Sequence, residues 1–127
     1  MIRRIAGAAL LLVVAGCGPT ESTQNLLKNL NDPDSAVRLR AVKTLGARRS
    51  EAAAIAPALA DRLQNDDDLY VRRDSANALA AFGAAGKPAW TALVDAARKD
   101  REPRVRKVAL AALKKIDADS AAREGFH

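Results

Sequence analysis

Apolar and polar positions recur along this chain with a period of 34 residues. The pair Val37-Arg38 returns 34 and 68 residues later, and each valine is followed by a small residue at four positions, an apolar residue at five and a leucine at eight. These spacings place the repeated residues on one stripe of a helix. The four columns are Val37, Val71 and Val105; Ala41, Ser75 and Ala109; Val42, Ala76 and Leu110; and Leu45, Leu79 and Leu113. The pattern predicts one amphipathic helix in each of three repeats.

An acidic residue three positions before each repeated valine predicts where these helices begin. Asp34 and Asp68 are residues that cap free helical amides, while Glu102 is followed by Pro103, which suits the first helical position. A second apolar pattern lies upstream of each acidic residue and predicts a first helix. Its positions are Leu26, Leu27 and Leu30; Ile55, Leu59 and Leu63; and Trp90, Leu93, Val94 and Ala97. Each repeat is therefore expected to be a helical hairpin.

Glycine and proline mark the predicted connections between hairpins. Gly46 and the segment bounded by Gly83 and Gly86 are expected to end second helices. Pro57 lies inside an apolar helical pattern, where proline removes an amide donor and crowds the preceding turn. Two alternatives follow for this proline. Either its helix begins near Ala56 or the helix is kinked at Pro57.

The repeated segments NDPDSAVRLRAVKTLG, DDDLYVRRDSANALAAFG and DREPRVRKVALAAL resemble HEAT repeats, most closely the short HEAT-like type of phycobilin lyases. This resemblance implies an all-α fold, an α-solenoid of three stacked helical hairpins. The hairpins are expected at about residues 26–49, 50–83 and 87–116, within a repeat domain of residues 26–116. Residues 117–127 are then a C-terminal tail that could cap the end of the stack.

The same resemblance implies a ladder of acidic and arginine side chains along the stack. In the family, the acidic turn residue and the arginine of neighbouring units pair with each other. The matching residues here are Asp32, Asp66 and Asp100 with Arg38, Arg72 and Arg106. An arginine fork can bind a carboxylate bidentately and also donate to turn carbonyls. We expect these six residues to have a structural role.

The N-terminus has the order of a secretory signal peptide. Arg3 and Arg4 precede a short apolar run that ends at the only cysteine, Cys17, and about 20 apolar residues would be needed to span a bilayer. The tetrad Val14-Ala15-Gly16-Cys17 resembles the lipobox of bacterial lipoproteins, in which the thiol is acylated and the peptide is cut before it. We therefore expect a signal peptide at residues 1–16 and a lipid anchor on Cys17.

Cleavage before Cys17 leaves residues 17–25 as a lipidated tether to the membrane. Loss of Arg3 and Arg4 lowers the formal net charge from +6 to +4. Gly18 follows the acylated position, and by resemblance to proteobacterial sorting this favours the periplasmic side of the outer membrane over the inner membrane. The location is the bacterial cell envelope, and a nucleic-acid partner is excluded by that compartment.

Catalytic chemistry finds little support in this composition. The only histidine is the last residue, His127, so no histidine-based acid, metal cluster or triad can be assembled. Asp66-Asp67-Asp68 is an acidic cluster, but it lacks the spaced ligands of a calcium loop and already supplies a cap and a ladder residue. We expect no enzyme activity, no metal and no cofactor. A phycobilin-lyase-like enzyme is the lesser alternative.

The remaining function class is binding. Because four columns of each second helix face the core, four others are expected to face solvent on a concave surface. These are Leu39, Arg73 and Lys107; Arg40, Asp74 and Val108; Lys43, Asn77 and Ala111; and Thr44, Ala78 and Ala112. The candidate binding residues among them are Arg40, Lys43, Arg73, Asn77 and Lys107. We expect a membrane-anchored scaffold that binds an acidic protein partner; the alternative is an accessory subunit of an envelope enzyme or transporter.

Overall fold

The computed structural model describes residues 20–127, and the predicted signal peptide, Cys17 and Gly18 lie outside this range. The chain forms α2 (Thr23–Asn29), α3 (Ser35–Gly46), η1 (Arg49–Glu51), α4 (Ala52–Asn65), α5 (Leu69–Ala81), η2 (Gly83–Ala89), α6 (Trp90–Lys99), α7 (Pro103–Ile116) and α8 (Ala118–Arg123). No strand occurs between residues 20 and 127. The predicted all-α solenoid of stacked hairpins is confirmed.

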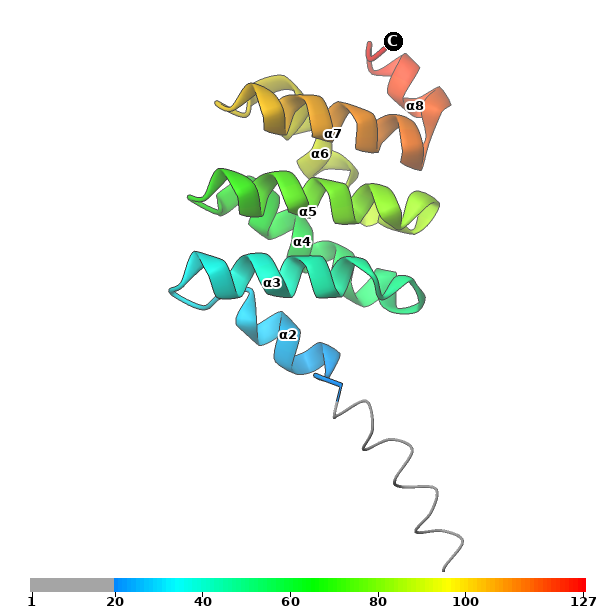
Figure 1. Ribbon diagram of the computed structural model, residues 1–127. Coiled ribbons are helices and arrows are strands. Elements are labelled where there is room, and N and C mark those ends of the chain that lie inside the picture. Colours follow the sequence, from blue (N-terminus) through cyan, green and yellow to red (C-terminus); the bar gives the residue numbers. More distant parts are fainter. Residues whose placement is uncertain (1–19) are drawn as a thin grey trace, which may run out of the picture.

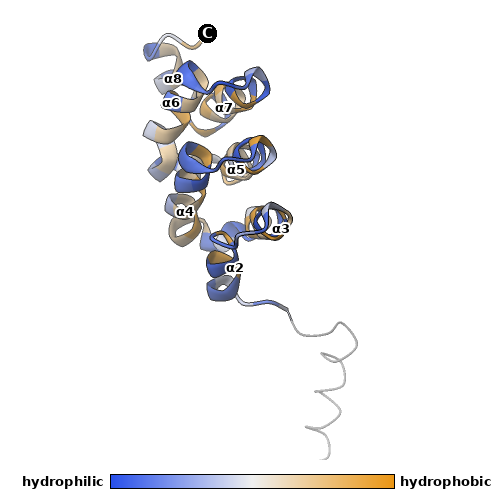
Figure 2. Cartoon of the chain, turned by 90° about the vertical axis from the view of Figure 1, so that its left-hand side faces the viewer, coloured by the Kyte–Doolittle hydropathy of each residue, from blue (hydrophilic) through white to orange (hydrophobic). Residues whose placement is uncertain are grey.

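The helices form two layers. The second helices α3, α5 and α7 lie side by side in one layer, and the first helices α2, α4 and α6 form the other (Figures 1 and 2). The core lies between the layers and contains the repeated leucines Leu45, Leu79 and Leu113, all fully buried. The main contacts of each hairpin are with its neighbours in the stack, as expected for a solenoid.

The acidic residues before the second helices cap them as their positions predict. Asp34 accepts a hydrogen bond from the Ala36 amide at 2.9 Å. Asp68 accepts two, from the amides of Tyr70 and Val71. Glu102 makes no side-chain cap, because α7 instead begins with Pro103, which has no amide hydrogen to satisfy.

The helix that contains Pro57 begins before it. The 3₁₀ turn η1 leads directly into α4, whose first residue is Ala52, so the alternative start near Ala56 is wrong. Pro57 lies in the second turn of α4 with its ring exposed to solvent, while Ile55 and Leu59 on the opposite side are fully buried. The apolar stripe of α4 therefore continues through the proline.

Gly46 and Gly83 have different roles. Gly83 has a positive φ of 58° directly after Phe82, the C-cap of α5, which is a conformation that glycine adopts at low cost. Gly46 is still helical, and a Cβ added to it would lie 2.8 Å from the Cβ of Ala78. Gly46 is the last residue of α3, as predicted, and it also permits close packing of α3 against α5.

The predicted core columns are mostly buried, and exceptions occur only in the outer repeats. Val37 and Leu110 remain half-exposed because α3 and α7 each pack beside only one other second helix, α5.

Three residues that were predicted to face solvent are instead buried. Asp74, Ala78 and Ala112 are buried, because the second helices pack against one another as well as against the first helices.

Both ends of the stack are closed by short helices. Ser22 caps α2 by accepting a hydrogen bond from the Asn25 amide at 3.1 Å, so residues 23–25, which the sequence places in the tether, are helical. At the other end, α8 packs on α7 and buries Ala121. Phe126 then folds back beneath the guanidinium of Arg98, 5.1 Å from the ring centre.

Candidate functional site

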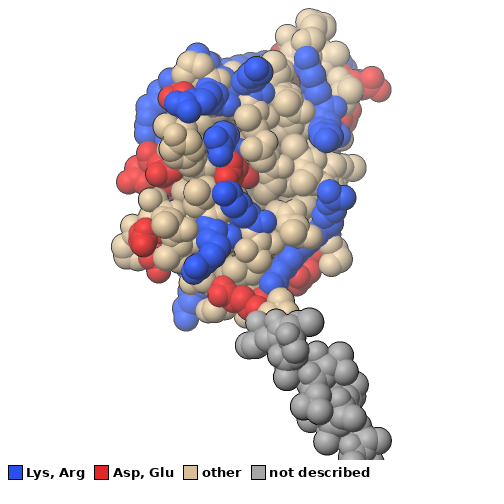
Figure 3. Space-filling model, viewed as in Figure 1, with Lys and Arg blue, Asp and Glu red and all other residues tan. Residues whose placement is uncertain are grey.

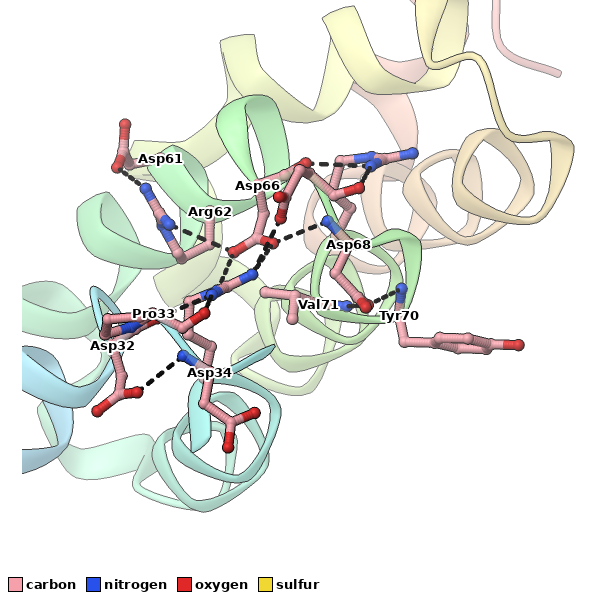
Figure 4. A network of polar contacts seen from close by, with 12 residues as sticks. Asp32, Pro33, Asp34, Asp61, Arg62, Asp66, Asp68, Tyr70 and Val71 are labelled. Carbon is pink, nitrogen blue, oxygen red and sulfur yellow. Dashed lines mark hydrogen bonds and ion pairs between the residues drawn. The ribbon is translucent and has the colours of Figure 1, made fainter. Parts of the chain in front are cut away.

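The turns at one end of the second helices hold a chain of arginine–aspartate contacts. Arg38 donates from Nε to Oδ2 of Asp66 at 2.9 Å and from Nη2 to Oδ1 at 3.0 Å, across the boundary between the first two hairpins (Figure 4). Its Nη1 donates to the carbonyl oxygens of Asp32 and Pro33 in its own turn. One buried guanidinium thus joins two successive turns.

Asp66 is the acceptor at the centre of this network. Besides Arg38, it accepts from Arg62 Nη1 at 3.3 Å and from the Asp68 amide at 3.0 Å. Burial raises the pKa of Asp66, but the hydrogen bonds from Arg38 and the Asp68 amide, with the charges of Arg38 and Arg62, outweigh it and hold this pKa below its ordinary value. The carboxylate is therefore ionised at neutral pH.

The second contact repeats the first one hairpin further along. Arg72 donates from Nε to Oδ2 of Asp100 at 3.0 Å and from Nη2 to Oδ1 at 3.2 Å. Its Nη1 donates to the carbonyl oxygens of Asp66 and Asp67. The Asp100 carboxylate also accepts from the Glu102 amide, as Asp66 does from the Asp68 amide. The side-on arginine–aspartate geometry is the same in both contacts.

The remaining two residues of the predicted ladder lie at its ends. Asp32 accepts a hydrogen bond from the Asp34 amide at 2.9 Å, and Arg106 donates from Nη1 to the Asp100 carbonyl oxygen at 2.6 Å. Neither of them forms a salt bridge with a residue between 20 and 127. The structure therefore brings together four of the six predicted residues as arginine–carboxylate pairs.

Two further residues belong to this network and were not identified from the sequence. Arg62 contacts Asp66 from the preceding helix, four positions earlier, and Asp67 accepts from Arg38 Nη2 at 3.0 Å. The spacing of four between Arg62 and Asp66 is a recognised signal for side-chain pairs on helices. The Asp67 contact has no such signal, because it depends on how successive turns stack.

The predicted binding residues lie on the face formed by α3, α5 and α7, here called the second-helix face. Lysine and arginine side chains are spread over this face with acidic side chains between them (Figure 3). Arg40, Lys43, Asn77 and Lys107 are exposed, and the side chain of Arg73 is 32% exposed. All five predicted residues are thus within reach of a partner.

Two of these cations are tied to a buried carboxylate. Asp74 lies between α3 and α5 and accepts from Arg73 Nε at 2.9 Å, with Lys43 Nζ at 4.0 Å. A shallow groove between the two helices is lined by Val42, Lys43, Gly46, Asp74, Asn77 and Ala78. Arg73 and Lys43 therefore have a structural contact in addition to their exposed groups, whereas Arg40 and Lys107 have no ion pair among residues 20–127.

Tyr70 extends the second-helix face toward the turns. It is an exposed large hydrophobic residue, and its ring lies 5.1 Å from the guanidinium of Arg73 and 6.0 Å from that of Arg104. Arg104 is held by Glu102 at 3.0 Å, and this hydrogen bond raises the pKa of Arg104. Tyrosine and arginine are the residue types that most often dominate binding at protein interfaces.

The acidic side chains of the described chain are candidate metal ligands, and its helices are candidate membrane spans. This part of the chain contains no group of three or more histidine, cysteine or acidic side chains placed to hold a metal ion. Asp66 and Asp68 of the acidic cluster are engaged by Arg38 and by the α5 amides, respectively. Over the same residues, no helix is both long and apolar enough to cross a bilayer.

Comparison with known protein families gives one match. Residues 3–80, which are more than half of the chain, match the family described as HEAT repeats. Comparison with curated proteins gives no match. The matched range includes the first hairpin and most of the second, with the first arginine–aspartate contact between them. The stacked hairpins of the structure and this family match show that the chain belongs to the HEAT-repeat family.

Proposed function

We propose that this protein is a lipid-anchored, non-catalytic interaction module of the bacterial cell envelope, and that its second-helix face binds an acidic protein partner. HEAT repeats commonly serve as protein-interaction modules. The observation that carries the proposal is the side-by-side arrangement of α3, α5 and α7, which puts cations from three repeats on one continuous face. The module serves as a scaffold at the membrane surface.

The cations of this face differ in how freely they can meet a partner. Arg40 and Lys107 are exposed and have no carboxylate within the described chain. Such charges speed association and set specificity more than they add affinity, and salt screens them. Tyr70 adds an apolar contact on the same face, beside Arg73 and Arg104. The partner that suits this surface carries clustered aspartate or glutamate side chains.

Charge reversal tests the binding face. The double variant Arg40→Glu with Lys107→Glu should capture fewer acidic partners from detergent-solubilised envelopes, most clearly at low salt, with unchanged helicity and melting. The matched control is Lys28→Glu with Lys99→Glu, which makes the same charge change at exposed positions of the first helices α2 and α6. Equal capture by both double variants would place the binding surface elsewhere.

The anchor is tested separately. The lipobox-like tetrad that ends at Cys17 motivates it, and acylation at this thiol supplies the two or three chains that hold a protein on a membrane, at about 0.8 kcal/mol for each buried methylene. Mass spectrometry of the wild type should find the lipid on Cys17. The Cys17→Ser variant should leave the membrane fraction. A variant that stays membrane-bound in high salt, with no lipid mass on the wild type, contradicts the anchor.

A further inference from the structure

The two internal arginine–aspartate contacts define what the ends of the ladder lack. In both of them Nη1 of the arginine donates to its own turn, and Nε with Nη2 binds both oxygens of an aspartate in the next hairpin. Arg106 keeps the first part of this pattern, because its Nη1 donates to the Asp100 carbonyl. Its Nε and Nη2 donate to no group between residues 20 and 127. Arg106 is thus an arginine positioned for a carboxylate from outside this stack.

A carboxylate of the required shape is present at the opposite end of the same chain. In both internal contacts the aspartate also accepts from the amide two residues later, which fixes its orientation. Asp32 has this same turn, with the Asp34 amide 2.9 Å from its Oδ1. No arginine between residues 20 and 127 contacts the Asp32 carboxylate. Asp32 therefore has the orientation of the two internal acceptors and no arginine on it among residues 20–127.

The short terminal helices are complementary in the same way. α4 has 14 residues, whereas α2 has 7 and α8 has 6. One period of 34 back, residues 118–123 correspond to 84–89 in η2, and two periods back they correspond to 50–55, the end of η1 and the first turn of α4. Residues 23–29 correspond to 57–63 in α4. α8 thus matches the segment that leads into a first helix, and α2 matches the rest of that helix. In Figure 1, α8 lies at the right-hand end of α7, and α2 lies below the middle and left of α3.

We propose that two copies of this chain associate head to tail, with Asp32 of one copy binding Arg106 of the other. In this arrangement α2 of one copy lies beside α8 of the other, and together they occupy the place of a full first helix over α7. The junction continues the 34-residue repeat from one chain into the next. The association is heterologous, so each dimer keeps one free Asp32 and one free Arg106, and further copies can add.

Charge also favours this pairing of ends. Around Arg106, the last hairpin carries Lys99, Arg101, Arg104 and Lys107 against the acids Asp100 and Glu102. The first hairpin up to its turn carries Glu21, Asp32 and Asp34 against the single cation Lys28. The segments around the two turns therefore differ in the sign of their net charge, which favours a head-to-tail encounter of Asp32 with Arg106. Attachment to a membrane would further raise the effective concentration of the ends.

Sedimentation velocity of the purified full chain in detergent tests the proposal. The average mass of the wild type should rise over a concentration series. Asp32→Arg and Arg106→Glu should each weaken association at least about tenfold, because each leaves a charge at the junction without its partner. A mixture of these two variants should associate again, since one retains Asp32 and the other retains Arg106. Arg106→Gln, which introduces no new charge, should also weaken association.

Lys107→Glu is the matched control, because it makes the same charge change as Arg106→Glu one residue away at an exposed position. It should weaken association far less than Arg106→Glu, because it changes only the charge around the junction and leaves the pair of Asp32 and Arg106 intact, and all variants should keep the wild-type helicity. A monomeric wild type at every concentration overturns the proposal. A mixture of Asp32→Arg and Arg106→Glu that associates no more strongly than either variant alone also overturns it. So does a Lys107→Glu variant that associates as weakly as Arg106→Glu, because that result would indicate general charge attraction only.

Discussion

The central hairpin and the outer hairpins have the same sequence pattern but different surroundings. Arg72, at the start of α5, is 3% exposed and binds Asp100 through two hydrogen bonds, whereas its equivalent Arg106 in α7 is half-exposed with no carboxylate from the described chain. Ala76 of the central hairpin is fully buried, while Leu110 in the same column remains partly exposed. For the arginine, the difference follows from whether another hairpin comes after it in the stack, because Arg38 of the first hairpin is buried and paired as Arg72 is.

This comparison separates two contributions to the fold. The local pattern sets each second helix and the acidic residue that precedes it, so a second helix of 12 to 14 residues occurs in all three hairpins, with a side-chain cap from Asp34 and from Asp68. Burial of the arginine depends on the following hairpin, which supplies the aspartate and covers the turn. In a solenoid, stability is approximately the sum of such repeat and interface contributions. Equivalent substitutions should therefore have unequal effects in the centre and at the end.

Arg72→Ala should have the largest effect. It removes both hydrogen bonds to Asp100, whose side chain is 8% exposed, and leaves the Asp66 carbonyl oxygen without its side-chain donor. The Asp67 carbonyl oxygen keeps only the longer contact from Arg101, at 3.4 Å. Breaking a buried pair by removing one partner destabilises proteins by about 3 kcal/mol. The melting temperature, followed by circular dichroism, should fall by roughly 10 °C or more for a domain of this size.

A matched control for this substitution is Arg104→Ala, which removes an arginine of the same face whose side chain is 59% exposed. Water and salt screen an exposed ion pair, so the melting temperature of Arg104→Ala should stay close to that of the wild type. Arg72→Ala could instead melt like Arg104→Ala and no longer capture the protein partner. Arg72 would then be a binding residue, and the structural role of the ladder would be contradicted.

Acid should have the next largest effect, because it neutralises Asp66 in its contact with Arg38. The pKa of Asp66 is lower in the folded protein than its ordinary value of 3.8, so the stability that its charge supplies is present above about pH 4. That stability is lost as the pH falls below this value through the lowered pKa. Urea unfolding between neutral pH and pH 3 should show a steeper acid loss for wild type than for Asp66→Asn. Parallel pH profiles would show that the Asp66 charge contributes nothing.

The sequence predicts the hairpins and the arginine–aspartate contacts better than it predicts the surface. Capping residues and the 34-residue period act locally, so Asp34 and Asp68 could be placed from spacing alone. Asp74 has the spacing of a solvent-facing residue, yet it is buried, because α3 packs against that side of α5. The spacing of residues on a single helix predicts which side faces the core. It does not predict contacts between adjacent second helices.

Ser75 offers a stabilising test of the central hairpin. Its side chain is fully buried, and its Oγ has no hydrogen-bond partner among residues 20–127. The outer hairpins carry alanine in the same column, at Ala41 and Ala109. Replacing a buried hydroxyl that makes no hydrogen bond removes its desolvation cost, so Ser75→Ala should raise the free energy of unfolding by about 1 kcal/mol. Urea unfolding measures this gain, and a loss of stability would show that Ser75 makes a hydrogen bond in solution.

Arg106→Ala should have the smallest effect on the isolated chain. At the end of the ladder, the substitution removes one hydrogen bond to the Asp100 carbonyl, and that half-exposed turn can bond water instead. A net loss of about 0.5 to 1 kcal/mol is expected, well below that of Arg72→Ala. Melting must be compared at protein concentrations low enough for the chain to be monomeric, because association stabilises the folded state by mass action. Equal losses for the two variants at low concentration would show that burial by a following hairpin does not determine what this arginine contributes.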